Sequence, residues 1–315
     1  MEARPLPRLA LIVPCYNEQD AFPEALRRLG DVLDELRAAH TIEDGFLYFI
    51  DDGSDDHTWQ LISSAAAGDS RIRGIKLSRN YGHQKALLAG LLHADGDALI
   101  SVDADLQDDL AAVKEMLLAF ARGAEIVYGV RRSRRMDARA KRLTAEGYYS
   151  FLRVIGVQLV FNHADYRLMS RRVVEALREF KEANVFLRGL IPQLGFPSAL
   201  VYYDRRERVA GKSKYTVSKM LSLAIEGVLS FSDVPLRIIT ILGLVISLAS
   251  FGMALWALWI RIFNPAAVPG WASIVIPLYM LGGVQLLCTG VLGQYLAKIY
   301  SESKARPRFI IEKIV

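Results

Sequence analysis

The first 130 or so residues alternate between short apolar runs and segments with helical periodicity, and this alternation restricts the possible folds more than any other feature. Five apolar runs are predicted as buried strands, at residues 9–13, 46–50, 72–77, 99–102 and 125–128. Helices are expected between them, because apolar residues such as Leu26, Leu29 and Leu33 recur every three or four positions. This pattern indicates an α/β fold with a mostly parallel, doubly wound sheet. No Gly-x-Gly-x-x-Gly follows any of these strands, which disfavours a dinucleotide-binding dehydrogenase.

Three of the predicted strands end in polar clusters, at Pro14–Glu18, Asp51–Asp56 and Asp103–Asp105. The carboxyl ends of parallel strands share one edge of a sheet, and ligands bind there in open α/β folds. A single cluster would be explained by the turn preferences of Asp, Gly and Ser. Three clusters at one edge crowd carboxylates that repel each other unless a cation or hydrogen-bond donors hold them. Asp103 and Asp105 offer the oxygen ligands that Mg²⁺ or Mn²⁺ binds together with the phosphates of a nucleotide.

Basic residues follow the predicted sheet strands in two clusters. Seven of them lie between residues 131 and 142, and a second group surrounds Gly211, from Arg205 to Lys214. The clusters are interpreted either as solvated loops or as loops that contact a donor diphosphate, a lipid phosphate or an anionic membrane face. The net charge of +5 also favours acidic partners. Nucleic acid is disfavoured as a partner, because the chain has no recognition motif and no interleaving of basic and aromatic residues.

The C-terminal part of the chain contains two uncharged runs that are predicted to span a membrane. Residues 238–260 form a run of 23 residues, about 35 Å of helix, and the second run covers 271–297 and includes Pro277. Lys214–Phe231 is amphipathic and is expected to lie in the membrane interface, whereas Tyr148–Phe161 fits a core helix or an interfacial helix equally well. Basic residues flank the pair of runs, so both termini and the folded part are expected in the cytosol.

These features divide the chain into four predicted parts. A cytosolic catalytic domain covers residues 1–213 and an interfacial amphipathic helix covers 214–235. Two membrane helices follow within 236–298, and residues 299–315 form a cytosolic tail. Two cysteines, Cys15 and Cys288, fall in different parts of the chain, so no disulfide is expected. The first apolar run is too short for the core of a signal peptide.

Six motifs, in order along nearly the whole chain, carry a resemblance to a known family. They are Val13–Glu18, Asp51–Ser54, Asp103–Gln107, Asp165–Ser170, Gly211–Tyr215 and Tyr300–Pro307. The chain resembles inverting glycosyltransferases of family 2 with the GT-A fold. More narrowly, it is similar to the bacterial polyprenyl-phosphate glycosyltransferases with two C-terminal membrane helices, relatives of dolichyl-phosphate mannose synthase. Gln294 departs from the pattern, because related proteins usually have Glu at that position.

The resemblance implies a role for each matching residue. Pro14, Tyr16, Glu18 and Asp52 would hold the nucleotide base and ribose. Asp103-Ala104-Asp105 would contact the nucleotide sugar, with Asp103 and Asp105 as ligands of Mg²⁺ or Mn²⁺ and Asp105 the more direct of the two. Arg131, Arg208 and Lys214 would meet the donor diphosphate or the acceptor phosphate. Asp165 matches the position of the family's candidate catalytic acid residue, and the catalytic set implied in this way is Asp165, Asp105, Arg208 and Lys214.

The implied reaction is transfer of one sugar from a UDP-sugar, with glucose the first choice, to a polyprenyl phosphate such as undecaprenyl phosphate. The family also implies a plasma-membrane location and a homo-oligomer, a tetramer. A phosphate monoester is mostly dianionic at neutral pH, since its second pKa is about 6, so Asp165 is expected to orient groups more than to remove a proton. Diacylglycerol or a protein as acceptor, a catalytically silent membrane scaffold and a soluble nucleotidyltransferase are the alternative interpretations.

Overall fold

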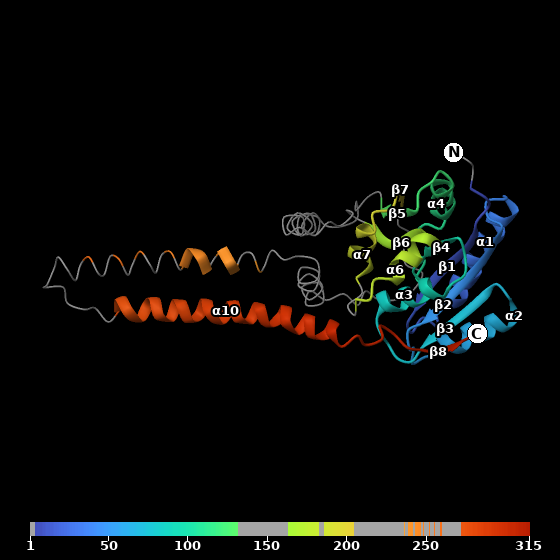
Figure 1. Ribbon diagram of the computed structural model, residues 1–315. Helices are drawn as coiled ribbons and strands as arrows, with labels where there is room; N and C mark the ends of the chain where they lie inside the picture. Colours follow the sequence, from blue (N-terminus) through green and yellow to red (C-terminus); the bar gives the residue numbers. More distant parts are fainter. Residues whose placement is uncertain are drawn as a thin grey trace. The chain divides into compact units, whose positions relative to one another are not determined.

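The computed structural model describes residues 4–131, 163–182, 186–204 and 272–315, together with scattered helical positions between 236 and 259 (Figure 1). The chain separates into two compact units. One contains the described residues up to 204 together with 305–315, and the other contains the described residues from 236 to 304. The C-terminal tail expected at 299–315 therefore contributes most of its length to the first unit.

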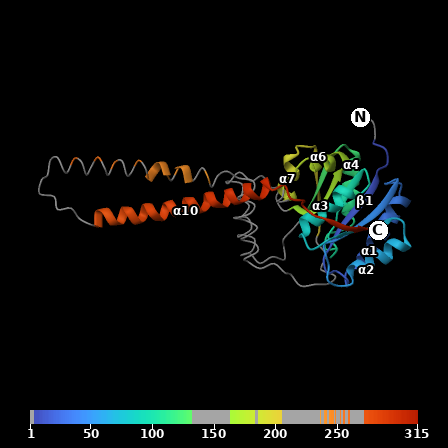
Figure 2. The same ribbon diagram turned by 60° about the horizontal axis from the view of Figure 1, so that its bottom comes forward.

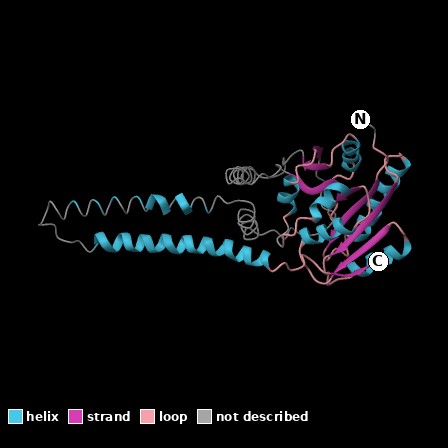
Figure 3. Ribbon diagram, in the orientation of Figure 1, coloured by secondary structure: helices cyan, strands magenta, loops and turns pink. Residues whose placement is uncertain are grey.

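The first unit is built on one eight-stranded sheet, drawn in magenta in Figure 3, with the order β7-β5-β6-β4-β1-β2-β3-β8. Its strands are β1 (Arg8–Cys15), β2 (Asp44–Asp51), β3 (Ile72–Leu77), β4 (Ala98–Ser101), β5 (Ile126–Arg131), β6 (His163–Ser170), β7 (Ser198–Tyr203) and β8 (Ile311–Ile314). Neighbours β1 and β2, β1 and β4, β2 and β3, and β5 and β7 are parallel. β6 runs antiparallel to β4 and β5, and β8 runs antiparallel to β3. The predicted mostly parallel α/β sheet is confirmed.

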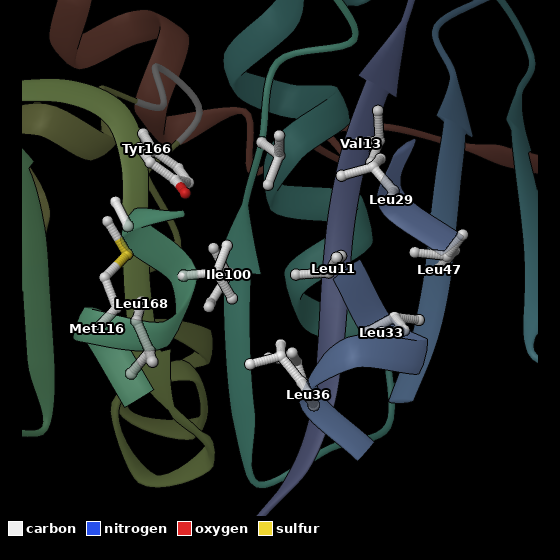
Figure 4. Packing of buried hydrophobic residues seen from close by; sticks show 14 of the residues in the cluster. Leu11, Val13, Leu29, Leu33, Leu36, Leu47, Ile100, Met116, Tyr166 and Leu168 are labelled. Atoms are coloured by element: carbon white, nitrogen blue, oxygen red, sulfur yellow. The ribbon is translucent and has the colours of Figure 1, made fainter. Parts of the chain in front are cut away.

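Helices cover both faces of this sheet (Figure 2). They are α1 (Phe22–Ala38), α2 (Thr58–Gly68), α3 (His83–His93), α4 (Ala112–Ala121), α6 (Arg171–Arg178) and α7 (Leu187–Gln193). On one face, Leu29 and Leu33 of α1 point onto Leu11 of β1 and Leu47 of β2 (Figure 4). Burying each such leucine contributes about 1.5–3 kcal/mol, so this apolar stripe fixes where α1 lies on the sheet.

α3 packs on the opposite face of the sheet. A Cβ added to Gly90 of α3 would lie 2.4 Å from Ile12 Cγ2 and 2.6 Å from Ile50 Cδ1. The helix therefore approaches β1 and β2 so closely that only glycine fits at this position. This contact holds the first turn of α3 near the carboxyl ends of the central strands, where the polar clusters lie.

The motif Asp165–Ser170 lies in strand β6, and α6 begins directly after it at Arg171. Arginine side chains usually lie at the surface, but that of Arg167 is fully buried in this strand, where the carboxylate of Asp165 pairs with its charge. Ser170 then caps α6, because its side-chain oxygen accepts a hydrogen bond from the N–H of Val173 at 3.2 Å.

The described part of the second unit consists mainly of α10 (Ala272–Ser303), a 32-residue helix that contains Pro277. Among the residues that the structure describes, no helix is both long and apolar enough to cross a membrane. The two spans expected at 238–260 and 271–297 are therefore not supported by these residues, and most of the first lies outside them. The amphipathic helix expected at 214–235 and the segment 148–161 also lie outside the described residues.

Candidate functional site

The loop after β1 and the loop after β2 are joined by hydrogen bonds between side chains and backbone. Asn17 donates its N–H to Ser54 Oγ at 3.0 Å and accepts, through Oδ1, from the N–H of Asp55 at 2.9 Å. Glu18 N–H donates to Thr58 Oγ1 at 2.9 Å. Asn17 adopts φ 55°, a left-handed conformation that Asn tolerates better than most residues. These bonds bring the Pro14–Glu18 cluster beside the Asp51–Asp56 cluster, as the sequence predicts.

Asp52 is buried and connects the end of β2 to the start of α3. Its carboxylate accepts from the N–H of Tyr81 at 2.7 Å and from the N–H of Gly82 at 2.9 Å. Burial raises the pKa of Asp52, and the two N–H groups oppose that rise. Gly53 follows with φ +68°, and a Cβ there would lie 2.4 Å from the carbonyl carbon of Arg79, so only glycine allows this approach.

Asp103 and Asp105 lie in the turn that follows β4. Leu106 closes this turn with φ 48°, and its N–H donates to the carbonyl oxygen of Asp103 at 3.1 Å. Burial raises the pKa of Asp103 to about 6; His83 opposes the rise, and the carboxylates of Asp108, Asp165 and Asp105 add to it. A carboxyl group in this state gains from a nearby cation, because the cation would relieve repulsion between the neighbouring carboxylates.

The donor set at this turn fits a hard divalent cation. Asp103 and Asp105 supply carboxylate oxygens, and the Asp103 side chain is 39% exposed. Within the described parts of the chain, no group of three or more His, Cys, Asp or Glu side chains is arranged to hold a metal ion. Mg²⁺ is commonly bound by one or two protein carboxylates, and substrate phosphates and waters complete its coordination. Ala104, between the two carboxylates, is buried.

Asp165 is the centre of a dense polar cluster on β6. Oδ1 accepts from Arg167 Nη2 and, at 3.1 Å, from Arg188 Nε. Oδ2 accepts from Arg188 Nη2 at 3.0 Å and from Gln84 Nε2 at 2.9 Å. Burial would raise the pKa of Asp165, but its hydrogen bonds and the two guanidinium groups hold that pKa well below the usual range. Asp165 is therefore a carboxylate at neutral pH, with its oxygens already occupied.

His83, the first residue of α3, lies between two of the predicted site carboxylates. Its Nε2 is 3.7 Å from Asp103 Oδ1 and 3.6 Å from Asp165 Oδ2. Burial lowers the pKa of His83, but the nearby carboxylates of Asp165 and Asp103 outweigh burial and raise it. His83 thus connects the Asp103–Asp105 turn to the cluster around Asp165.

Arg131 lies at the end of β5, in a third polar group at the same edge of the sheet. Its Nη2 donates to Asp108 Oδ1 at 3.1 Å and its Nε donates to Tyr203 Oη at 3.2 Å, while Tyr203 donates to Asp108 at 2.6 Å. Burial works against the charge of Arg131, but Asp108 and Tyr203 raise its pKa, so it remains a cation. Two other predicted site residues, Arg208 and Lys214, lie outside the described residues.

The structure therefore brings together most of the predicted site and adds side chains that the sequence did not single out. The carboxyl ends of β1, β2 and β4 bring Pro14, Tyr16, Glu18, Asp52, Asp103 and Asp105 to one edge, and Asp165 and Arg131 join them from β6 and β5. His83, Gln84, Asp108, Arg188 and Tyr203 are the additions. His83 and Gln84 directly follow the strand at 72–77 and the turn after it, so the sequence could have indicated that they lie at this edge. Arg188 lies in no motif.

Comparison with known sequences identifies the family. The profile of glycosyl transferase family 2 matches residues 10–178, more than half of the 315-residue chain. The chain belongs to glycosyl transferase family 2. The matched range contains all three polar clusters and Asp165.

Relatives of this family 2 protein match it over nearly their full lengths. An uncharacterised glycosyltransferase of Bacillus subtilis, YkoT, is 46% identical over 97% of this chain and 91% of its own length. A bactoprenol glucosyl transferase of Shigella phage SfV is 39% identical over 97% of this chain and 98% of its own length. The similarity thus extends well beyond the catalytic core, into the C-terminal part of the chain.

A solved structure with a similar fold is the mannosyltransferase PcManGT from Pyrobaculum calidifontis, determined with GDP-Man and Mn²⁺. It has a TM-score of 0.50 and 16% sequence identity, and the match covers 96% of this chain and 88% of that chain. At this identity the comparison shows the fold alone. It agrees with the GT-A-like α/β architecture that the resemblance implied.

Proposed function

We propose that this family 2 glycosyltransferase transfers one sugar from a nucleotide sugar to a polyprenyl phosphate at a membrane surface. The full-length similarity to bactoprenol glucosyl transferases carries the proposal, because bactoprenol is a polyprenol and the identity is 38–39% over 97% of this chain. UDP-glucose is the first-choice donor and undecaprenyl phosphate the first-choice acceptor. The polar edge of the sheet supports the proposal with the charged and polar groups that such a transfer requires.

The donor would lie across the carboxyl ends of β1, β2 and β4. Pro14, Tyr16, Glu18 and Asp52 would hold the base and ribose, since their loops are joined by the hydrogen bonds described above. The backbone at Ala104 would lie along the sugar-diphosphate. These contacts would position the anomeric carbon of the donor near Asp165 and Arg131 without themselves taking part in bond formation.

Asp103 and Asp105 would hold Mg²⁺ or Mn²⁺ together with the donor diphosphate. A divalent cation bound there supplies positive charge that stabilises the departing diphosphate. The accessible carboxylate of Asp103 supports this assignment, because a cation can reach it from solvent.

In the transfer itself, an oxygen of the acceptor phosphate bonds to the anomeric carbon from the face opposite the leaving group. The bond from that carbon to the diphosphate breaks, and its electron pair leaves with the nucleoside diphosphate, so the configuration inverts. The attacking phosphate is already mostly dianionic at neutral pH, so no base is needed. Asp165, ionised and occupied by four donors, would orient its neighbours, while Arg131, Arg208 and Lys214 would bind phosphate.

A polyprenyl acceptor requires the catalytic unit to work at a membrane, and the proposal includes attachment to the plasma membrane with the catalytic unit in the cytosol. Two uncharged runs, 238–260 and 271–297, support it. So do the apolar side chains that α10 exposes, which are Ile274, Leu278, Leu281, Leu292, Leu296 and Ile299. The expected homo-oligomer, a tetramer, belongs to the same proposal and would be measured by light scattering in detergent.

A donor panel tests the proposal. Purified protein in detergent is given undecaprenyl phosphate, Mn²⁺ and a series of radiolabelled UDP- and GDP-sugars, and label is counted in the organic extract. We expect one donor, UDP-glucose first, to label a lipid that mild acid cleaves. Asp105→Ala should abolish labelling. Asp95→Ala is the matched control, because Asp95 is exposed and lies before β4, at the opposite end of that strand; it should label like the unaltered protein.

Labelling from a GDP-sugar would support the proposed transfer to a polyprenyl phosphate and would replace UDP-glucose as the donor. Labelling of diacylglycerol or of protein in place of the lipid phosphate would assign a different acceptor. UDP binding without transfer from any donor would contradict the proposal and favour the catalytically silent scaffold.

A further inference from the structure

Two guanidinium groups share the single carboxylate of Asp165. Arg167 and Arg188 each donate to it. The two arginines differ in exposure: the Arg167 side chain is 0% exposed, whereas that of Arg188 is 38% exposed. Of the two arginines, Arg188 is therefore the one that a ligand can reach from solvent.

Arg188 is held in place from two directions. Its Nε and Nη2 both donate to Asp165, at 3.1 and 3.0 Å, which fixes the plane of the guanidinium group. The backbone at the preceding residue, Leu187, is also fixed. The side chain of Gln84 donates to Asp165 at 2.9 Å and accepts from the N–H of Leu187 at 3.2 Å. A flexible side chain that is oriented in advance loses little entropy when it binds an anion.

The same cluster is continuous with the Asp103–Asp105 turn. His83 lies 3.6 Å from Asp165 and 3.7 Å from Asp103, so Arg188 belongs to the edge of the sheet where the donor diphosphate is proposed to lie. An arginine that is partly exposed, oriented by a carboxylate and adjacent to this edge is suited to bind a phosphate group there.

We propose that Arg188 binds a phosphate group of one of the two substrates, held in position by Asp165 and Gln84. This inference rests on the proposed function and adds to it a phosphate-binding residue outside the predicted motifs. The phosphate comes either from the acceptor lipid or from the donor diphosphate. In both cases the guanidinium group donates to phosphate oxygens and forms no covalent bond.

The test compares Arg188→Gln and Arg188→Lys with the unaltered chain, in detergent and with the donor identified by the panel. The Michaelis constants for donor and acceptor are measured separately, and kcat with them. Arg37→Gln is the matched control, since Arg37 is an exposed arginine paired with Asp44 at 3.7 Å at the other end of the sheet. Thermal unfolding of each variant shows whether the fold is retained, which we expect because Arg167 and Gln84 still hold Asp165.

We expect Arg188→Gln to raise the Michaelis constant of one substrate by about tenfold or more, the size of effect that loss of a charged hydrogen bond produces. Arg188→Lys should recover part of the loss, and Arg37→Gln should change neither constant. A rise for the acceptor assigns the lipid phosphate to Arg188, and a rise for the donor assigns the diphosphate. Unchanged Michaelis constants for both substrates would overturn the proposal, as would a loss of activity fully explained by a lower unfolding temperature.

A binding measurement separates this inference from the proposed function. UDP and a short-chain, water-soluble polyprenyl phosphate are titrated into the full chain without turnover. If the unaltered protein transfers no sugar but Arg188→Gln still weakens binding of either ligand about tenfold, the reaction is wrong and the phosphate site stands. If transfer occurs and both ligands bind Arg188→Gln normally, the reaction stands and the phosphate site is wrong.

Discussion

His83 Nε2 lies 3.6 Å from Asp165 Oδ2, so the first residue of α3 meets the carboxylate near the start of β6. This contact, with those of Arg167, Arg188 and Gln84, surrounds Asp165 with donors and leaves its side chain 8% exposed. An ionised carboxylate in such a shell serves best as an anchor for cationic and amide side chains. It is poorly suited to take a proton, because protonation would break several of these contacts.

The stability of the protein should depend on the charge of Asp165. Its folded-state pKa lies well below the ordinary value of about 3.9, so the stability it contributes is present above pH 4 and is lost as the pH falls further. We expect Asp165→Asn to lower the free energy of unfolding at pH 7 by about 3–5 kcal/mol, the usual cost of breaking a buried ion pair. Urea unfolding at a series of pH values measures this difference, which should shrink below pH 4. A difference that stays constant down to pH 3.5 would rule out the ionised anchor; Asp95→Asn should show no difference at any pH.

Binding of Mn²⁺ should require both carboxylates of the turn after β4. We expect Asp103→Asn and Asp105→Asn each to weaken Mn²⁺-dependent UDP binding by about tenfold or more at pH 7.5. Each substitution removes one of the two carboxylate ligands of the cation, and changes around metal ligands commonly reduce metal affinity by about this factor. Titration calorimetry with and without Mn²⁺ measures the effect. If the unaltered chain binds UDP equally well with and without Mn²⁺, the proposed role of the metal in donor binding is wrong.

The contact between α3 and the sheet predicts the effect of a single methyl group. A Cβ at Gly90 would overlap Ile12 and Ile50, so Gly90→Ala should lower the free energy of unfolding by about 1–3 kcal/mol despite the better helix propensity of alanine. Gly68→Ala is the comparison, since nothing lies within 4 Å of a Cβ at this last residue of α2. Chemical unfolding should find Gly68→Ala unchanged or slightly stabilised. Equal stabilities for the two variants would mean that α3 does not pack this closely.

The C-terminal strand should stabilise the catalytic unit. β8 covers the edge of β3, with Gly74 and Val315 exchanging backbone hydrogen bonds of 2.8 and 2.9 Å. We expect a chain ending at residue 308 to unfold at a lower temperature and to aggregate more readily, because an uncovered edge strand offers unpaired backbone groups. Glu312→Ala is the control: it removes only an exposed ion pair with Lys76, so its effect should stay within about 1 kcal/mol. An unfolding temperature that truncation leaves unchanged would contradict this role.

The alternating pattern of the first 130 or so residues was sufficient to predict the parallel half of the sheet. Each strand there contains a short, mostly buried apolar run, and each polar cluster marks a carboxyl end, so Asp52 and Asp103 were placed correctly at the same edge of the sheet. Local sequence carried this information because both faces of these strands contact helices. Local signals decide the structure when burial is nearly uniform along an element.

The antiparallel additions could not be predicted in the same way. β6 contains Asp165 and Arg167, whose charges are compatible with burial only because the folded chain pairs them with each other and with Arg188. β8 is short and mostly exposed, and it becomes a strand because β3 has a free edge about 235 residues earlier in the chain. Arg188 was missed for the same reason, since its importance follows from long-range contacts that no local motif encodes.

The most direct test of the proposed reaction compares two acceptors that differ only in the phosphate. Undecaprenyl phosphate and undecaprenol are offered in parallel to the purified protein with the labelled donor and Mn²⁺, and the organic-extractable label is counted. The account predicts label in the lipid only when the phosphate is present, in a product that mild acid cleaves. Equal labelling of undecaprenol, or labelling of neither lipid while the donor is consumed, would contradict the proposed transfer to a polyprenyl phosphate.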